Sequence, residues 1–172
     1  MKPSIYIETT IPSYLASRLS TNIITAGQQI LTREWWEQER HHYRLYVSQA
    51  VLDESGGGNA EQAKKRLALI RAIPLLPIND TVAALSAVYM NLLSIPLSAS
   101  MDAIHLAISV AHRIDYLLTW NCRHLAHGET RRKLHRYNAT NELHEPMIVT
   151  PQEMEGSHDI SRRNCGRSTR HP

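Results

Sequence analysis

Short apolar runs alternate with longer helix-favouring segments along most of this chain. The β-favouring runs lie at residues 5–7 (IYI), 43–48 (YRLYVS), 74–78 (PLLPI), 115–120 (DYLLTW) and 147–149 (MIV). Runs of this length, bounded by turn-forming residues, are typical of buried strands. The segments between them predict helices at residues 26–40, 59–73, 80–94, 98 or 100 to 113, and 129–137.

This alternation predicts an α/β fold. Strands that alternate with helices form a mostly parallel sheet with helices on both faces. We therefore expect an α/β/α sandwich around a central sheet of four to five strands. Asn59 and Asp80 begin two of the helical segments and are expected to cap them.

Four oxygen-bearing side chains follow the predicted strands or begin a helix beside them. Glu8 follows the first strand, Glu54 lies just beyond the second, and Asn121 comes directly after the strand at 115–120. Asp102 lies in the first turn of the helix that begins near residue 100. Because sites in parallel sheets gather at the carboxyl ends of the strands, we expect these four side chains at one edge.

Each of these residues alone has an ordinary structural interpretation. Asp102 is favourable near a helix N-terminus, Glu54 could be solvated, and Asn121 could serve a turn. Together, three converging carboxylates with no basic residue among them would repel one another, and a divalent cation removes that repulsion. Oxygen ligands favour Mg²⁺ or Mn²⁺ over zinc, and such ions can activate water for phosphodiester hydrolysis.

Composition limits the class of protein. The 172 residues, 42% hydrophobic and 20% charged, suit one soluble domain. No apolar stretch approaches the ~18 residues of a membrane span, and the start of the chain lacks the pattern of a signal peptide. Cys122 and Cys165 do not resemble a disulfide framework. We therefore expect a cytoplasmic protein.

The net charge of +3 comes from the end of the chain. Residues 157–172 contain four arginines and one acid, Asp159, so residues 1–156 balance at zero. We expect one domain at 1–156 and a basic, disordered tail at 157–172. The tail could be an electrostatic arm for RNA or a solvated extension without function.

Four segments carry a resemblance to a known family: IYIETTIPSYLA, YVSQAVLDE, MDAIHLAIS and YLLTWNCRHLAH. In this order and spacing they resemble the PIN-domain family, in particular the VapC-type toxins of bacterial toxin–antitoxin pairs. The resemblance extends from Ile5 to about Glu155. It implies a metal-dependent endoribonuclease with a doubly wound α/β/α domain, a homodimer that a small cognate antitoxin inhibits.

The resemblance also assigns roles to residues. The three family acids correspond to Glu8, Glu54 and Asp102, and the fourth position, Asp or Asn, corresponds to Asn121. These four are the expected catalytic and metal-binding residues, with Mg²⁺ or Mn²⁺ as the cofactor. The expected contacts to the RNA lie beside them, at Thr9, Ser13, Thr119, Arg123 and His124.

Two positions depart from the family pattern. Glu8 stands where Asp is common, and His124 stands where an acid is frequent, which leaves open whether one or two ions bind. His124 could contact a phosphate or be an ordinary surface histidine. The expected substrate is tRNA or another structured RNA, cut in a single-stranded loop that can enter a narrow cleft.

Three other interpretations stay open or are disfavoured. The chain could be a non-catalytic PIN-like module that binds Mg²⁺ and acts through protein partners. A nucleotide-binding domain is disfavoured, because no glycine-rich turn follows the first strand. A zinc site at Cys122, His124 and His127 is also disfavoured, because the spacing matches no common Cys/His pattern.

His105 lies three residues after Asp102. It could share the helix face of Asp102 and reach the site, or it could pack in the core.

Overall fold

A five-stranded parallel sheet forms the centre of the protein in a computed structural model, which describes residues 1–154. The strands are β1 (Ser4–Ile7), β2 (Arg44–Ser48), β3 (Leu75–Leu76), β4 (Tyr116–Leu118) and β5 (Met147–Val149). Their order is β3-β2-β1-β4-β5, and every neighbouring pair is parallel. The predicted α/β fold is confirmed. The predicted tail at 157–172 lies outside the described residues.

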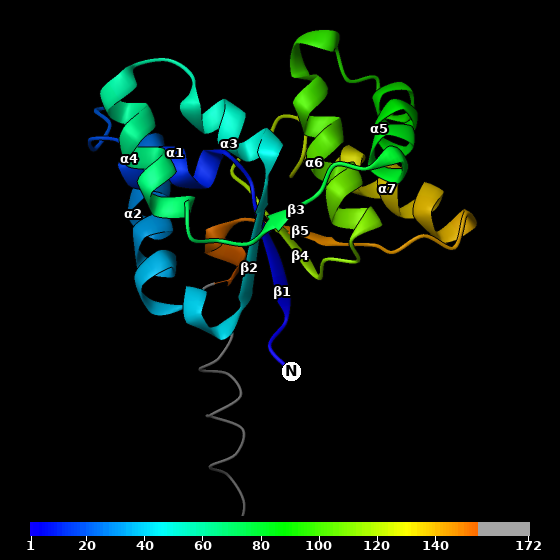
Figure 1. Cartoon of the computed structure of the whole chain (residues 1–172), viewed down its shortest axis with the longest axis horizontal. Helices are drawn as coiled ribbons and strands as arrows, with labels where there is room; N and C mark the ends of the chain where they lie inside the picture. The colour runs from blue at the N-terminus through cyan, green and yellow to red at the C-terminus, as the bar shows by residue number, and fades with distance from the viewer. Residues whose placement is uncertain (155–172) are drawn as a thin grey trace, which may run out of the picture.

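Helices cover both faces of this sheet. They are α1 (Thr10–Ala16), α2 (Ile23–Gln38), α3 (Gln49–Gly56), α4 (Ala60–Ile70), α5 (Asp80–Leu92), α6 (Ser100–Ala111) and α7 (Gly128–Thr140), with 3₁₀ turns at Arg40–His42, Leu97–Ala99 and Pro151–Met154. Figure 1 shows α1, α2 and α4 on one side of the sheet and α5, α6 and α7 on the other. This two-sided cover explains why β1 is buried at all four positions.

Helix α1 was not predicted from the sequence. Its segment TIPSYLA contains β-branched residues and Pro12, which have low helix propensity. Pro12 is tolerated because it lies in the first turn, where its missing N–H has no intrahelical partner to lose. The helix packs against α2 and α4, so tertiary contacts outweigh its weak propensity.

Helix caps correct two of the predicted boundaries. Asn79, not Asp80, caps α5, because its side chain accepts a hydrogen bond of 3.0 Å from the backbone N–H of Val82. Asp80 lies in the first turn instead. Helix α2 begins at Ile23, earlier than predicted, after a cap at Asn22. The predicted cap at Asn59 is confirmed.

None of the helices within residues 1–154 combines the length and the hydrophobicity that a membrane span requires.

Ser4 and Asp115 tie the start of β1 to the start of β4. Asp115 Oδ2 accepts hydrogen bonds of 2.7 Å from both the N–H and the hydroxyl of Ser4, and the Ser4 hydroxyl accepts one of 2.9 Å from the Asp115 N–H. The backbone N–H of Ser4 is the main cause that holds the pKa of Asp115 below its ordinary value, with the hydroxyl adding to it.

We expect Ser4→Ala to lower the free energy of unfolding by about 1 kcal/mol at neutral pH. Because the pKa of Asp115 is depressed in the folded state, its ionised form favours folding above the unfolded pKa. The difference between the two proteins should therefore shrink as the pH falls through the folded pKa. Urea unfolding at several pH values measures this, with Ser86→Ala as control, because the half-buried Ser86 hydroxyl bonds to the Ala83 carbonyl of its own helix and not to an acid. Equal effects of the two substitutions would contradict the prediction.

Candidate metal centre

Glu8 follows β1 at the middle of the sheet and is only 4% exposed. Its Oε2 accepts hydrogen bonds from the Thr10 N–H (3.1 Å), the Thr10 hydroxyl (2.5 Å) and the Thr119 hydroxyl (2.7 Å). Burial raises the pKa of the Glu8 carboxyl above its ordinary value, although these donors and the charge of His105 act in the opposite direction. Glu8 is thus a buried acid whose charge is only partly compensated by the protein.

Glu54 approaches from α3, just beyond the end of β2. Its Oε2 accepts a hydrogen bond from the Thr9 hydroxyl and lies 2.9 Å from His105 Nε2. Its side chain is 33% exposed, so it is open to solvent at the edge of the sheet. Burial acts to raise the pKa of Glu54, but the bond and charge of His105 outweigh it and lower the pKa. Glu54 therefore stays ionised more readily than Glu8.

His105 lies between these carboxylates, on α6, and is fully buried. Its Nε2 bonds to Glu54, and its Nδ1 lies 2.8 Å from the hydroxyl of Tyr6, which is also 2.6 Å from the Ser48 hydroxyl. Burial acts to lower the pKa of His105, but the bond to Glu54 and the surrounding negative charge outweigh it and raise the pKa. The expectation of an acidic cluster without a basic residue was therefore wrong.

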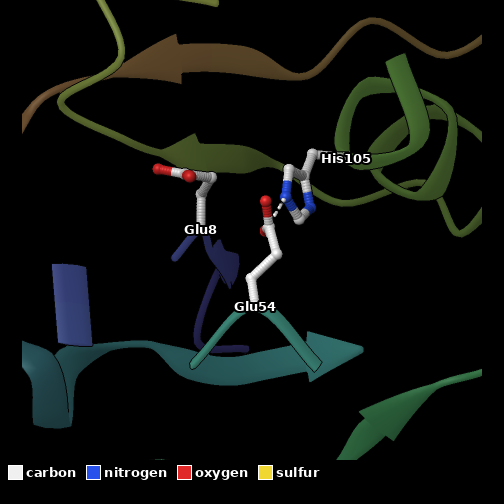
Figure 2. A group of neighbouring side chains, drawn as sticks. All are labelled: Glu8, Glu54 and His105. Atoms are coloured by element: carbon white, nitrogen blue, oxygen red, sulfur yellow. Dashed lines mark hydrogen bonds and ion pairs between the residues drawn. The ribbon is translucent and has the colours of Figure 1, made fainter. Parts of the chain in front are cut away.

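Glu8, Glu54 and His105 form a compact cluster that could hold a metal ion. One ligand atom from each residue lies within 4.8 Å of the others. Figure 2 shows the three side chains, with the bond from Glu54 to His105 dashed. The cluster is built from the end of β1, from α3 and from α6, so three separate segments position it.

Asp102 lies one helical turn before His105 and is 8% exposed. Its Oδ1 accepts a hydrogen bond of 2.9 Å from Asn121 Nδ2, and its Oδ2 lies 2.7 Å from His124 Nδ1. The Thr119 hydroxyl accepts a bond of 2.9 Å from the Asn121 N–H while it donates to Glu8. Glu8 and Asp102 thus belong to one hydrogen-bonded network, although Asp102 is outside the cluster described above.

No known protein family matches this chain. No curated protein matches it either. The structure therefore establishes an α/β fold with a five-stranded parallel sheet, and the likeness to PIN domains stays an interpretation of the sequence.

The expected RNA-contacting residues are distributed around this network. Thr9 bonds to Glu54, Thr119 bonds to Glu8, and His124 bonds to Asp102. Arg123 is exposed beside them, and Ser13 is half-buried on α1. His124 therefore orients an acid in this structure, which the sequence did not indicate.

The ligand types fit a hard divalent cation. Glu8 and Glu54 supply carboxylate oxygens, and Asp102 supplies two more nearby, as Mg²⁺ and Mn²⁺ prefer. His105 Nε2 bonds to Glu54 at 2.9 Å, so in this structure it holds that carboxylate in place. Within residues 1–154, the alternative zinc residues Cys122, His124 and His127 form no comparable cluster.

Proposed function

We propose that this protein is a metal-dependent endoribonuclease of the PIN type, which cuts RNA phosphodiester bonds with Mg²⁺ or Mn²⁺. The observation that carries the proposal is the juxtaposition of Glu8, Glu54 and His105 at the carboxyl end of the central strand. Asp102, one turn away on α6, adds the third acid. Such an edge is where parallel sheets place their reactive groups.

The residues divide into ligands and positioning groups. Glu8, Glu54 and Asp102 would hold the metal ion, which when bound activates water and stabilises the leaving oxygen. His105 and the Thr9 hydroxyl hold the Glu54 carboxylate in place.

Two further groups of donors act in the same way on the other acids. The hydroxyls of Thr10 and Thr119 hold Glu8. Asn121 and His124 bond to opposite oxygens of Asp102, so its carboxylate plane is fixed. Because these side chains are already held in place, they lose little conformational entropy when the substrate binds.

The partners are part of the same proposal. An RNA phosphate would meet the exposed Arg123 beside the acids, and a single-stranded loop, of tRNA or another structured RNA, fits such an edge better than a duplex. A cognate antitoxin and a second copy of the chain are the expected protein partners of a VapC-type toxin. Ile23 and Ile24, which are 85% and 70% exposed on α2, support a protein contact there.

Cleavage of a structured-RNA pool by the purified protein tests this function. We expect cuts with Mn²⁺ and with Mg²⁺, and none in EDTA. Glu54→Gln should cut at least about tenfold more slowly, because a neutral amide is a poorer metal ligand. The control Asp53→Asn should cut normally, because Asp53 is exposed and, among residues 1–154, its side chain bonds only to Gln49. Cuts that persist in EDTA, or equal loss in both variants, would overturn the proposal.

A non-catalytic metal-binding module is the second candidate. It is favoured by the donors that already satisfy Asp102 at both oxygens, from Asn121 and His124. This function predicts that Mn²⁺ raises the melting temperature of the folded protein while every RNA in the pool stays intact. Metal-dependent cutting in the same samples would exclude it.

A further inference from the structure

Helix α7 carries a concentration of positive charge close to the candidate site. Its sequence GETRRKLHRYNAT contains four cations, Arg131, Arg132, Lys133 and Arg136, and one acid, Glu129. The net charge of residues 1–156 is zero, because acids elsewhere in the chain balance the cations of this helix, so the total does not reveal the local charge. A local positive field of this kind attracts polyanions.

Two of the pockets that border α7 adjoin each other. The near pocket, of about 210 Å³, lies between the loop at 93–96 and α7 and is lined by Arg123, His124, His127 and Lys133. The far pocket, of about 420 Å³, is lined by Leu92, Arg132, Lys133, Arg136, Tyr137 and Thr140. Lys133 lines both, so the two pockets are neighbours on one surface.

The near pocket adjoins the proposed metal ligands. His124 lines this pocket and bonds to Asp102 with its ring. A strand of RNA whose scissile phosphate reaches Asp102 would therefore pass Arg123 and Lys133 as it leaves the site. Because Lys133 also lines the far pocket, the next nucleotide of such an RNA strand would lie beside that pocket.

Two of the cations on α7 are available for a ligand. Arg132 is paired with Glu129 at 2.8 Å, and Arg131 with Glu153 at 3.2 Å. Lys133 and Arg136 form no ion pair with any residue of 1–154. They are three residues apart, and so lie on one face of the helix at the rim of the far pocket.

We propose that α7 and its two pockets form a subsite for one nucleotide of the RNA beside the cut bond. Lys133 and Arg136 bind its phosphate, and its base enters the far pocket against Leu92 and Tyr137. The inference rests on the proposed function and names where that substrate docks.

The shape and lining of the far pocket suit a base. Its volume is within the range of small-ligand sites. Tyr137 offers a ring, and its edge-to-face packing on Tyr89, with centroids 6.0 Å apart, holds that ring in place. Stacking on an aromatic side chain is the usual way in which proteins bind single-stranded bases without strict sequence preference.

The phosphate contacts are tested by the binding of a fluorescein-labelled single-stranded RNA 12-mer. Binding is measured by fluorescence anisotropy in EDTA, so that the RNA stays intact. The double variant Lys133→Gln/Arg136→Gln should bind about tenfold more weakly than the wild type. Its plot of log K against log salt should be shallower by about 0.7, the loss of one neutralised phosphate. The control Lys64→Gln/Arg71→Gln removes two exposed cations at α4, with the same change in net charge, and should stay within about twofold of the wild type.

A second pair of variants tests the base pocket. Thr140→Trp fills the far pocket without a change in charge and should weaken RNA binding about fivefold. Ala139→Trp puts the same ring at the neighbouring exposed position and should leave binding unchanged. The subsite would be overturned if a test variant and its control bound the RNA with equal affinity, for the charge variants or for the Trp variants. A wild type that does not bind the RNA would also overturn it.

Two further readouts separate this inference from its alternatives. If an acidic peptide loses affinity for the double variant while RNA does not, α7 is a protein-docking surface and the inference fails. Cleavage with Mn²⁺ is followed in the same variants. If the wild type and the double variant cut at equal rates, the subsite is contradicted but the proposed nuclease function is not. If RNA binding depends on α7 but no RNA is cut, the nuclease function is contradicted but the subsite is not.

Discussion

Replacing Glu8 with Gln should reduce metal-dependent RNA cleavage about a thousandfold and at the same time stabilise the metal-free protein. The amide keeps one oxygen for the donors of Thr10 and Thr119, but removes a buried negative charge that a metal ion needs. Loss of activity together with gain of stability is expected of a group that is retained for function. Cleavage rates with Mn²⁺ and melting temperatures in EDTA measure the two effects.

The pH dependence gives an independent check on Glu8. Burial raises the pKa of its carboxyl in the folded protein, so the protonated form favours folding below the unfolded pKa. That contribution is lost as the pH rises through the folded pKa. The stabilisation by Glu8→Gln in EDTA should therefore grow with pH. The exposed Glu37→Gln, the control, should show no such growth, and a Glu8→Gln protein that cuts normally would contradict the prediction.

His105→Phe should lower the free energy of unfolding by about 3 kcal/mol. It removes the bonds to Tyr6 and Glu54 at a fully buried position and leaves a half-buried carboxylate without its main partner. Because the pKa of His105 is raised in the folded protein, its stabilising charge is complete below the unfolded pKa and is lost as the pH rises through the folded pKa. The deficit of the variant should thus be largest in mildly acidic solution.

Urea unfolding across this pH range measures the loss, with the exposed His135→Phe as control. A purely structural role of His105 would leave the Mn²⁺ affinity of the folded variant unchanged, whereas a positioning role predicts a loss of about tenfold. His105→Gln, whose amide can still donate to Glu54, should recover part of that affinity. Unchanged Mn²⁺ affinity in His105→Phe would show that His105 does not position Glu54.

The sequence predicted the edge of the sheet where the site lies, but not which atoms meet there. Glu8, Glu54 and Asn121 follow strands, and the carboxyl ends of parallel strands meet at one edge, so their convergence follows from the alternation alone. The ring of His105 reaches Glu54 because α6 packs against α3, the helix that carries Glu54. Contacts of that kind depend on tertiary packing, which no local pattern encodes.

Three other features escaped prediction, each for a different physical reason. Helix α1 has a weak intrinsic propensity and forms because α2 and α4 pack on it. Asn79 and Asp80 are adjacent and both can cap a helix, so only the backbone geometry decides between them. The helix at 129–137 was predicted, but the positive charge of α7 was missed, because charge was summed along the chain whereas its effect depends on position in space.

The hydrogen bond between Thr119 and Glu8 joins residues 111 positions apart in the chain. A ribosome adds about 5–20 residues per second, so roughly 5–20 s pass after the synthesis of Glu8 before Thr119 exists. Until then β1 has no β4 to pair with, and Glu8 lacks the hydroxyl that holds it. A nascent chain, or a fragment released early, therefore cannot assemble these ligands. If the protein is a nuclease, the ribosome that makes it is safe from it at least until Thr119 has been added.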